Sequence, residues 1–130
     1  MSHRPIELIL MRQLAATLAM PIFLVDPDGT LAFFNPAAER ILGLRFDETG
    51  EMPANEWGAL WSPTADDGSA LRPDQLPLSV AVVERRAVHG ALWITANDGT
   101  RRHIDVTAIP LTVVTGEVVG AAAFFWETPP

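Results

Sequence analysis

Two residues that could carry acid–base chemistry, His103 and Asp105, lie two positions apart in a segment that alternates between apolar and polar residues. Alternation with a period of two is typical of a β-strand, so both side chains would project from one face. An aspartate general base near a histidine would suit proton transfer in a small cone-shaped α+β isomerase or dehydratase. The alternative for this pair is cross-strand polar pairing on a wet sheet face.

The rest of the chain argues against catalysis. The opposite side of the same predicted strand consists of Ile104, Val106 and Ala108, none of which can transfer a proton. The predicted domain begins with a β-hairpin followed by short helices, whereas the fold of these enzymes opens with its long helices. No Ser-His-Asp arrangement, phosphate-binding loop or spaced pair of carboxylates is visible. We therefore predict no catalytic residues and no enzymatic activity, and we keep the isomerase or dehydratase as an alternative.

Metal binding is also poorly supported. The chain has no cysteine and three histidines, of which His3 and His89 lie apart from His103. The lack of cysteine excludes disulfides, thiolate zinc sites, iron–sulfur clusters and cysteine nucleophiles. His103 and Asp105 would supply two ligands, whereas a protein metal site needs three or four. We predict no metal site.

Tryptophans are the residues best suited to hold a flat ligand. Their rings could stack on a non-covalently bound flavin, with Asn35 as a polar partner. The alternative is that these large side chains fill a small core. The four are Trp57, Trp61, Trp93 and Trp126.

Periodicity and turn residues predict the elements that would position these side chains. Their order gives a five-stranded antiparallel sheet with helices on one face, an α+β fold. Residues 1–19 form an N-terminal amphipathic flanking helix, and residues 20–128 form a single domain. The predicted helices cover residues 6–19, a short segment from Pro36, and residues 73–86; the predicted strands cover residues 22–25, 30–34, 88–96, 101–111 and 117–126.

The segment of residues 47–70 is acidic and rich in proline and glycine. Trp57, Leu60 and Trp61 nevertheless recur at helical spacing, which predicts a short helix with an inward aromatic face. The segment is either a mobile loop over a pocket or a solvated connector that its two tryptophans anchor to the core.

Size and charge narrow the class of protein further. A chain of 130 residues that is 48% hydrophobic can bury one core. A net charge of −7 argues against nucleic-acid binding, which needs clustered positive charge. The longest nearly apolar run, Leu14–Val25, is shorter than the roughly twenty residues of a membrane span. We predict a cytoplasmic protein with no nucleic-acid or membrane partner.

The motifs along the chain together resemble those of a PAS domain, over about residues 14–128. Ile22–Gly29 is similar to the first hairpin of that family, and Asn35–Gly43 to the segment that follows its second strand. The resemblance implies a curled sheet and helices around a ligand pocket, with dimerisation through the outer sheet face and the flanking helices. The further similar positions are Glu48, Gly50, Leu76-Pro77, Asp98-Gly99, Pro110, Gly116 and Gly120.

The resemblance also bears on cofactors. The blue-light flavin photoreceptors and the xanthopsin-type proteins of this family need a cysteine, which this chain lacks, so both covalent chemistries are excluded. Haem sensors of the family carry an axial histidine on the long helix, and residues 73–86 contain none, which disfavours haem. Non-covalent flavin, a small metabolite and an essentially filled pocket remain open.

We therefore predict a sensory or regulatory domain, as in a bacterial signal-transduction regulator. It would bind a small ligand or a partner and form a homodimer, with a signalling protein or fused effector outside this chain. The alternative is a ligand-free interaction and dimerisation module. The predicted ligand-binding residues are Phe34, Asn35, Trp57, Trp61, Leu76, Val80, Val83, Trp93 and Phe124. The predicted dimer interface is Ile9, Met11, Leu14 and Leu18.

Overall fold

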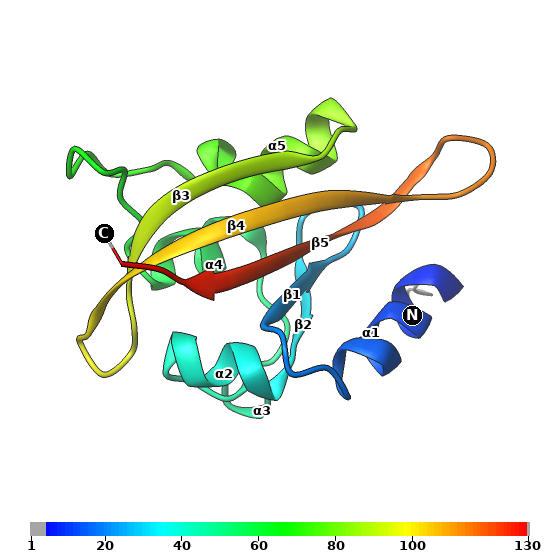
Figure 1. Ribbon diagram of the computed structural model, residues 1–130. Coiled ribbons are helices and arrows are strands. Elements are labelled where there is room, and N and C mark those ends of the chain that lie inside the picture. Colours follow the sequence, from blue (N-terminus) through cyan, green and yellow to red (C-terminus); the bar gives the residue numbers. More distant parts are fainter. Residues whose placement is uncertain (1–4, 130) are drawn as a thin grey trace.

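Five antiparallel strands form one curved sheet in the order β2-β1-β5-β4-β3 (Figure 1). The computed structural model describes residues 5–129. The predicted five-stranded antiparallel sheet is confirmed. The strands are β1 (Ile22–Val25), β2 (Leu31–Phe34), β3 (Val88–Thr95), β4 (Arg101–Thr112) and β5 (Val118–Glu127).

The helices cover both faces of the sheet unequally. Helices α2 to α5 pack on the inner face and enclose the larger hydrophobic cluster, whereas α1 packs on the outer face over β1 and β5 (Figure 1). The helices are α1 (Ile6–Ala15), α2 (Pro36–Leu42), α3 (Phe46–Thr49), α4 (Ala54–Leu60) and α5 (Pro77–Glu84), with a short 3₁₀ helix η1 (Pro73–Gln75).

Strand β1 is buried at all four positions because it lies between the two clusters. Phe23 and Val25 belong to the inner cluster, and Ile22 and Leu24 belong to the outer one. Side chains alternate between the faces of a strand, so each face of β1 contacts a different layer. Strand β1 therefore contacts the inner core with one face and α1 with the other.

The long helix predicted over residues 73–86 is interrupted at Leu76. Leu76 has an extended backbone conformation (φ −74°, ψ 146°), because a residue before proline is disfavoured in the helical region. Helix α5 therefore begins anew at Pro77, and its inward face shifts. Val80 is left half-buried and Val83 is 80% exposed. The residues of α5 that are buried are Pro77, Leu78 and Ala81.

Helix α1 ends at Ala15, four residues before the predicted end at Ala19. The side-chain amide of Asn35 donates hydrogen bonds to the carbonyl oxygens of Ala15 (2.9 Å), Leu18 (3.3 Å) and Met20 (2.8 Å). These bonds hold the chain in a turn after Ala15 and direct it into β1.

Asn35 is the one fully buried polar side chain among the described residues. Its carbonyl oxygen Oδ1 accepts hydrogen bonds from the backbone N–H of Ile22 and of Ala38, both at 3.0 Å. The bond from Ala38 caps the N-terminus of α2, a role that suits asparagine. One side chain therefore ties together the end of α1, the start of β1 and the start of α2.

We expect Asn35→Asp to destabilise the fold in a pH-dependent way. The introduced carboxyl would face backbone carbonyl oxygens, which favour its protonated form and raise its pKa in the folded state above the value of about 3.9 in the unfolded chain. The loss of folding free energy caused by the substitution is therefore smallest below about pH 3.9 and grows as the pH rises above that value. We expect a loss of at least about 2 kcal/mol at neutral pH, measured by urea unfolding. The control is Asn97→Asp at an exposed turn position; equal losses for Asn35→Asp at about pH 4 and about pH 8 would contradict the assignment.

Candidate functional site

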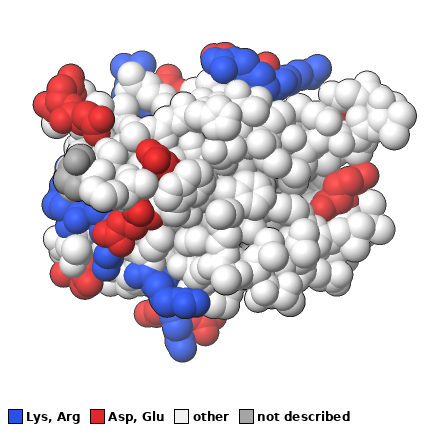
Figure 2. Space-filling model, viewed as in Figure 1, with Lys and Arg blue, Asp and Glu red and all other residues white. Residues whose placement is uncertain are grey.

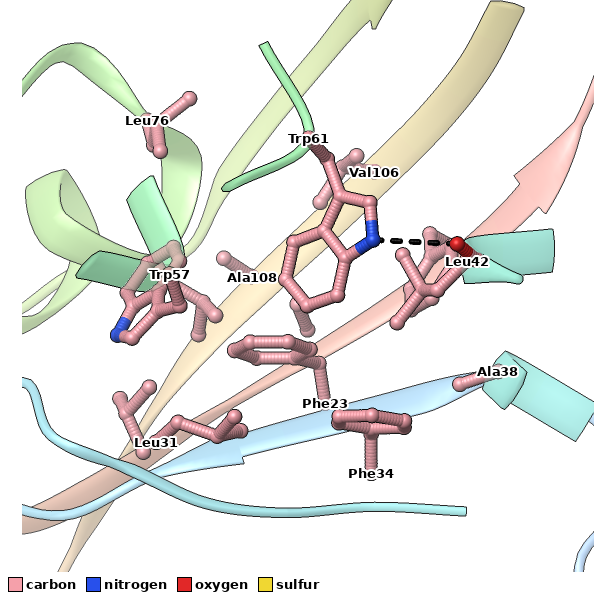
Figure 3. Close-up of a cluster of buried hydrophobic side chains, with 14 of the residues drawn as sticks. Phe23, Leu31, Phe34, Ala38, Leu42, Trp57, Trp61, Leu76, Val106 and Ala108 are labelled. Atoms are coloured by element: carbon pink, nitrogen blue, oxygen red, sulfur yellow. Dashed lines mark hydrogen bonds between the residues drawn. The ribbon is translucent and has the colours of Figure 1, made fainter. Parts of the chain in front are cut away.

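A cavity of about 90 Å³ lies between the inner face of the sheet and helices α4 and α5. Its wall is apolar, and the aromatic side chains of β1 and α4 converge in this region (Figure 3). The lining residues are Phe23, Leu42, Trp57, Trp61, Pro63, Leu76, Pro77, Leu78, Leu92, Ile94, Ile104, Val106, Ala123 and Phe125.

The two indole N–H groups in the wall are both engaged by backbone carbonyls. Trp57 Nε1 donates to Gly29 O at 2.9 Å, and Trp61 Nε1 donates to Leu42 O at 3.1 Å (Figure 3). Leu42 O also accepts from the backbone N–H of Asn97 at 3.0 Å. The rings are thus fixed in orientation, and no lining side chain has a free hydrogen-bond donor. The wall can recognise a ligand by shape and dispersion only.

Phe23 is the centre of the aromatic cluster. Its ring stacks on Phe34 (centroids 5.8 Å apart, planes 5° apart) and lies 5.1 Å from the ring of Trp57. The ring of Trp61 meets Phe23 edge-on at 6.0 Å. Aromatic pairs in these arrangements are stabilising beyond the area they bury. Phe34 therefore supports the wall from behind Phe23 and does not line the cavity itself.

Three of the predicted ligand-binding residues line the cavity: Trp57, Trp61 and Leu76. Asn35, predicted as the polar contact to a ligand, instead has all its side-chain hydrogen bonds to backbone groups of α1, the turn after α1, β1 and α2. Val80 and Val83 are outside the wall because of the helix restart at Pro77.

Trp93 and Phe124, also predicted at the pocket, lie on the opposite face of the sheet. Trp93 contacts the ring of His103 (5.0 Å) and the guanidinium of Arg101 (5.4 Å). Phe124 packs in the outer cluster beneath α1, and its neighbours in β5 face the cavity. Residues 118–126 show no polar–apolar alternation because β5 is covered on both faces. The sequence therefore does not show which side chains of this strand face the cavity.

Most of the wall was missed in the sequence. The signal for Ile104 and Val106 was present, because β4 alternates and its apolar side faces inward as expected. Leu92 and Ile94 follow from their pairing with β4: Leu92 lies opposite Ile104. Leu42, Pro63 and Phe23 had no local signal, because only the tertiary packing brings them together.

His103 and Asp105 lie on the outer face of the sheet, away from the cavity. His103 Nε2 is 3.1 Å from Asp66 Oδ1, and its Nδ1 is 2.8 Å from Thr128 Oγ1. Asp105 is paired with Trp126 and borders an open groove on this face. The pair therefore cannot act on a molecule in the cavity. His3 lies outside the described residues; within residues 5–129 no cluster of three or more metal-binding side chains occurs.

Three carboxyl groups in turns have shifted pKa values. The pKa of Asp67 is lowered by hydrogen bonds from the hydroxyl and the backbone N–H of Ser69. Partial burial raises the pKa of Asp26, with a further contribution from its neighbour Asp28 in the β1–β2 turn. The pKa of Asp98 in the β3–β4 turn is lowered, chiefly by hydrogen bonding from the backbone N–H of Thr100. None of the three lines the cavity, whose lining residues include no titratable side chain.

The cavity of this structure is smaller than a flavin. An engineered cavity of about 150 Å³ holds benzene in a well-studied protein, and the cavity here is smaller than that. The flavin ring system is larger than benzene and carries polar edges that would meet no free donor in the wall. The cavity suits a small, largely apolar molecule.

A second candidate surface is the outward side of α1 and the turn after it. Leu8 and Ala15 are buried against the sheet and Met11 is half-buried, but the other apolar side chains of this segment face solvent. Figure 2 shows few charged side chains over this side of the molecule, with most charges at its rim. No helix within residues 5–129 is both long enough and apolar enough to cross a membrane. The exposed residues are Ile6, Ile9, Leu10, Leu14, Leu18 and Met20.

Comparison with solved structures gives the same fold. The PAS domain of a protein from Colwellia psychrerythraea has a TM-score of 0.66 and 17% identity, over 92% of this chain and 97% of that chain. A LOV protein from Rhodobacter sphaeroides has a TM-score of 0.73 and 12% identity, over 96% and 69% of the two chains. The PAS domain of the fruit-fly ELK potassium channel has a TM-score of 0.70 and 7% identity, over 92% and 95%.

No curated protein matches the chain in sequence. A protein-family model described as the PAS fold matches residues 16–128, which is nearly the whole of the described structure. The sheet order, the inner layer of helices and this match agree, and the chain belongs to the PAS-fold family.

Proposed function

We propose that this chain is a sensory domain that binds a small, largely apolar molecule in the inner cavity and acts as a homodimer. The observation that carries the proposal is the cavity, whose wall is apolar and whose two indoles are held in place by backbone carbonyls. A wall fixed in this way is pre-formed, which lowers the cost of binding. Membership of the PAS-fold family supports a role in signalling.

The dimer is proposed through α1. Leu14 is 52% exposed on a helix that already buries Leu8 and Ala15 against its own sheet. Exposed apolar side chains that adjoin one another on a surface are typical of interaction sites. The predicted interface residues Ile9, Leu14 and Leu18 are all exposed, and Met11 is half-buried at the edge of the outer cluster. These residues remain a proposal for the interface.

Strand β1 offers a physical connection between the two sites. Phe23 faces the cavity, and its neighbours Ile22 and Leu24 pack beneath α1. A ligand that moves Phe23 would also bias the position of α1, and so the arrangement of a dimer. A signal of this kind is a shift between populated conformations. The partner that receives it would be a separate protein or an effector domain outside this chain.

Native mass spectrometry of untagged protein from its expression host tests the two parts together, because it reports subunit number and any bound mass. A dimer with a discrete small adduct would support both parts. A dimer without an adduct that also fails to bind small apolar probes would favour the alternative, a ligand-free dimerisation module. A monomer would contradict the α1 interface.

We expect Ala123→Leu to abolish binding while the domain stays folded. Ala123 lines the cavity from β5, and the larger side chain would occupy the empty space. Filling a cavity costs little stability, whereas overpacking a full core costs about 1–3 kcal/mol. Binding of a small apolar probe such as xenon, which is smaller than benzene, is measured by the change in tryptophan fluorescence. The matched control is Ala91→Leu, at an exposed position of the same sheet; probe binding that survives in Ala123→Leu would place the site elsewhere.

We expect Leu14→Asp to convert the dimer to a monomer. The substitution places a charge in the proposed apolar interface, where burial of an unpaired carboxylate is strongly unfavourable. Molar mass is measured by light scattering after size-exclusion chromatography. The control is Val83→Asp, the same change at an exposed apolar residue of α5. A Leu14→Asp protein that remains dimeric would overturn the placement of the interface on α1.

A further inference from the structure

Arg102 is the one charged residue of β4 on the inner face of the sheet. It is paired with Ile94 of β3, and it lies two residues from Ile104 in its own strand. Both isoleucines line the cavity. Residues two apart on a strand share a face and lie about 6.5 Å apart. Arg102 is therefore the next inward-facing position beyond the apolar wall, at the end of the sheet where the β3–β4 turn lies.

The guanidinium of Arg102 is only partly paired. Its Nη1 lies 3.1 Å and 3.2 Å from the two carboxylate oxygens of Glu127. Its Nε is buried and has no hydrogen-bond partner among the described residues. A buried donor without an acceptor is unfavourable, so this N–H is a position where a ligand oxygen would be stabilising.

The free edge of this guanidinium has a defined chemical preference. The N–H groups of Nε and Nη2 point in parallel from one side of the planar group, and they match the two oxygens of a carboxylate. Glu127 binds only through Nη1. The Nε on that edge is buried and has no acceptor among the described residues, and Arg102 adjoins the cavity without lining it. Asp98 is the other acidic group whose charge interacts with Arg102. The side chain is only 23% exposed, so a contact there would be shielded from bulk water.

We propose that the ligand of this domain is a small monocarboxylate, with its apolar tail in the cavity and its carboxylate on the free edge of Arg102. The inference rests on the proposed function of the cavity. The wall supplies no polar contact of its own, so a single arginine at one end would orient the molecule and select for the acid. The class would include fatty acids of about four carbons, because the cavity is smaller than one that holds a benzene ring.

The test compares butyrate with 1-butanol, which has the same number of carbon atoms and no charge, by titration calorimetry and tryptophan fluorescence. We expect wild-type protein to bind butyrate about tenfold or more tightly than 1-butanol, the difference expected for a hydrogen bond to a charged group. Arg102→Gln should remove this preference and keep the affinity for 1-butanol. The matched control is Arg101→Gln, on the neighbouring residue that faces outward toward Trp93; its preference should be that of the wild type.

Two further variants keep the test decisive. Arg102→Lys retains a positive charge but lacks the parallel N–H pair, and should weaken the binding of butyrate while leaving the affinity for 1-butanol unchanged. Glu127→Gln removes the competing carboxylate and should tighten the binding of butyrate. Equal affinity for the two probes in wild-type protein would overturn the inference and leave the cavity proposal standing. Failure of both probes to bind wild-type protein would overturn both proposals. Equal loss of both probes in Arg102→Gln and Arg102→Lys would also overturn the role of Arg102.

Discussion

The fold depends on one buried amide. Asn35 makes side-chain hydrogen bonds to backbone groups of three segments: the end of α1 with the turn after it, the first residue of β1 and the first turn of α2. A buried polar side chain is tolerated only when its hydrogen bonds are satisfied. Here the Asn35 amide nitrogen donates to backbone carbonyl oxygens, and its amide oxygen accepts from backbone N–H groups. The amide orients α1 over one face of β1 and starts α2 over the other, and so determines how the layers on the two faces meet.

The sheet consequently separates two different hydrophobic clusters, one on each of its faces. On the inner side, Phe23, Trp57 and Trp61 surround a small empty space. On the outer side, Ile22, Leu24 and Ala122 lie under α1. Because the interior of a protein is close-packed, a displacement on one side is transmitted to the other. The proposed sensing and association are therefore separated by a single strand.

The sequence predicted the elements better than it predicted the cavity. Turn residues and helix caps such as Asn35 and Pro36 act locally, and β4 has an apolar face that alternation reveals; these features were identified. The phase of β5 was wrong at Phe124 because both faces of that strand are apolar, and periodicity carries no information there. The predicted inward face of α5 was wrong at Val80 and Val83, because the helix does not run on from Pro73 but begins anew at Pro77.

The break at Leu76 also has a consequence for the size of the molecule that the domain can admit. The Leu76 carbonyl accepts the first hydrogen bond of α5, from Val80 N, while the Leu76 amide donates back to Pro73 O in η1. Rotation about the ψ angle of Leu76 carries its carbonyl with α5 and leaves its amide with η1, so neither bond breaks. The range of ψ before a proline is about 120–160°, and α5 extends a small rotation over roughly 12 Å. A change in this one backbone angle would therefore move Pro77 and Leu78, which line the cavity, relative to the part of the wall that the sheet supplies.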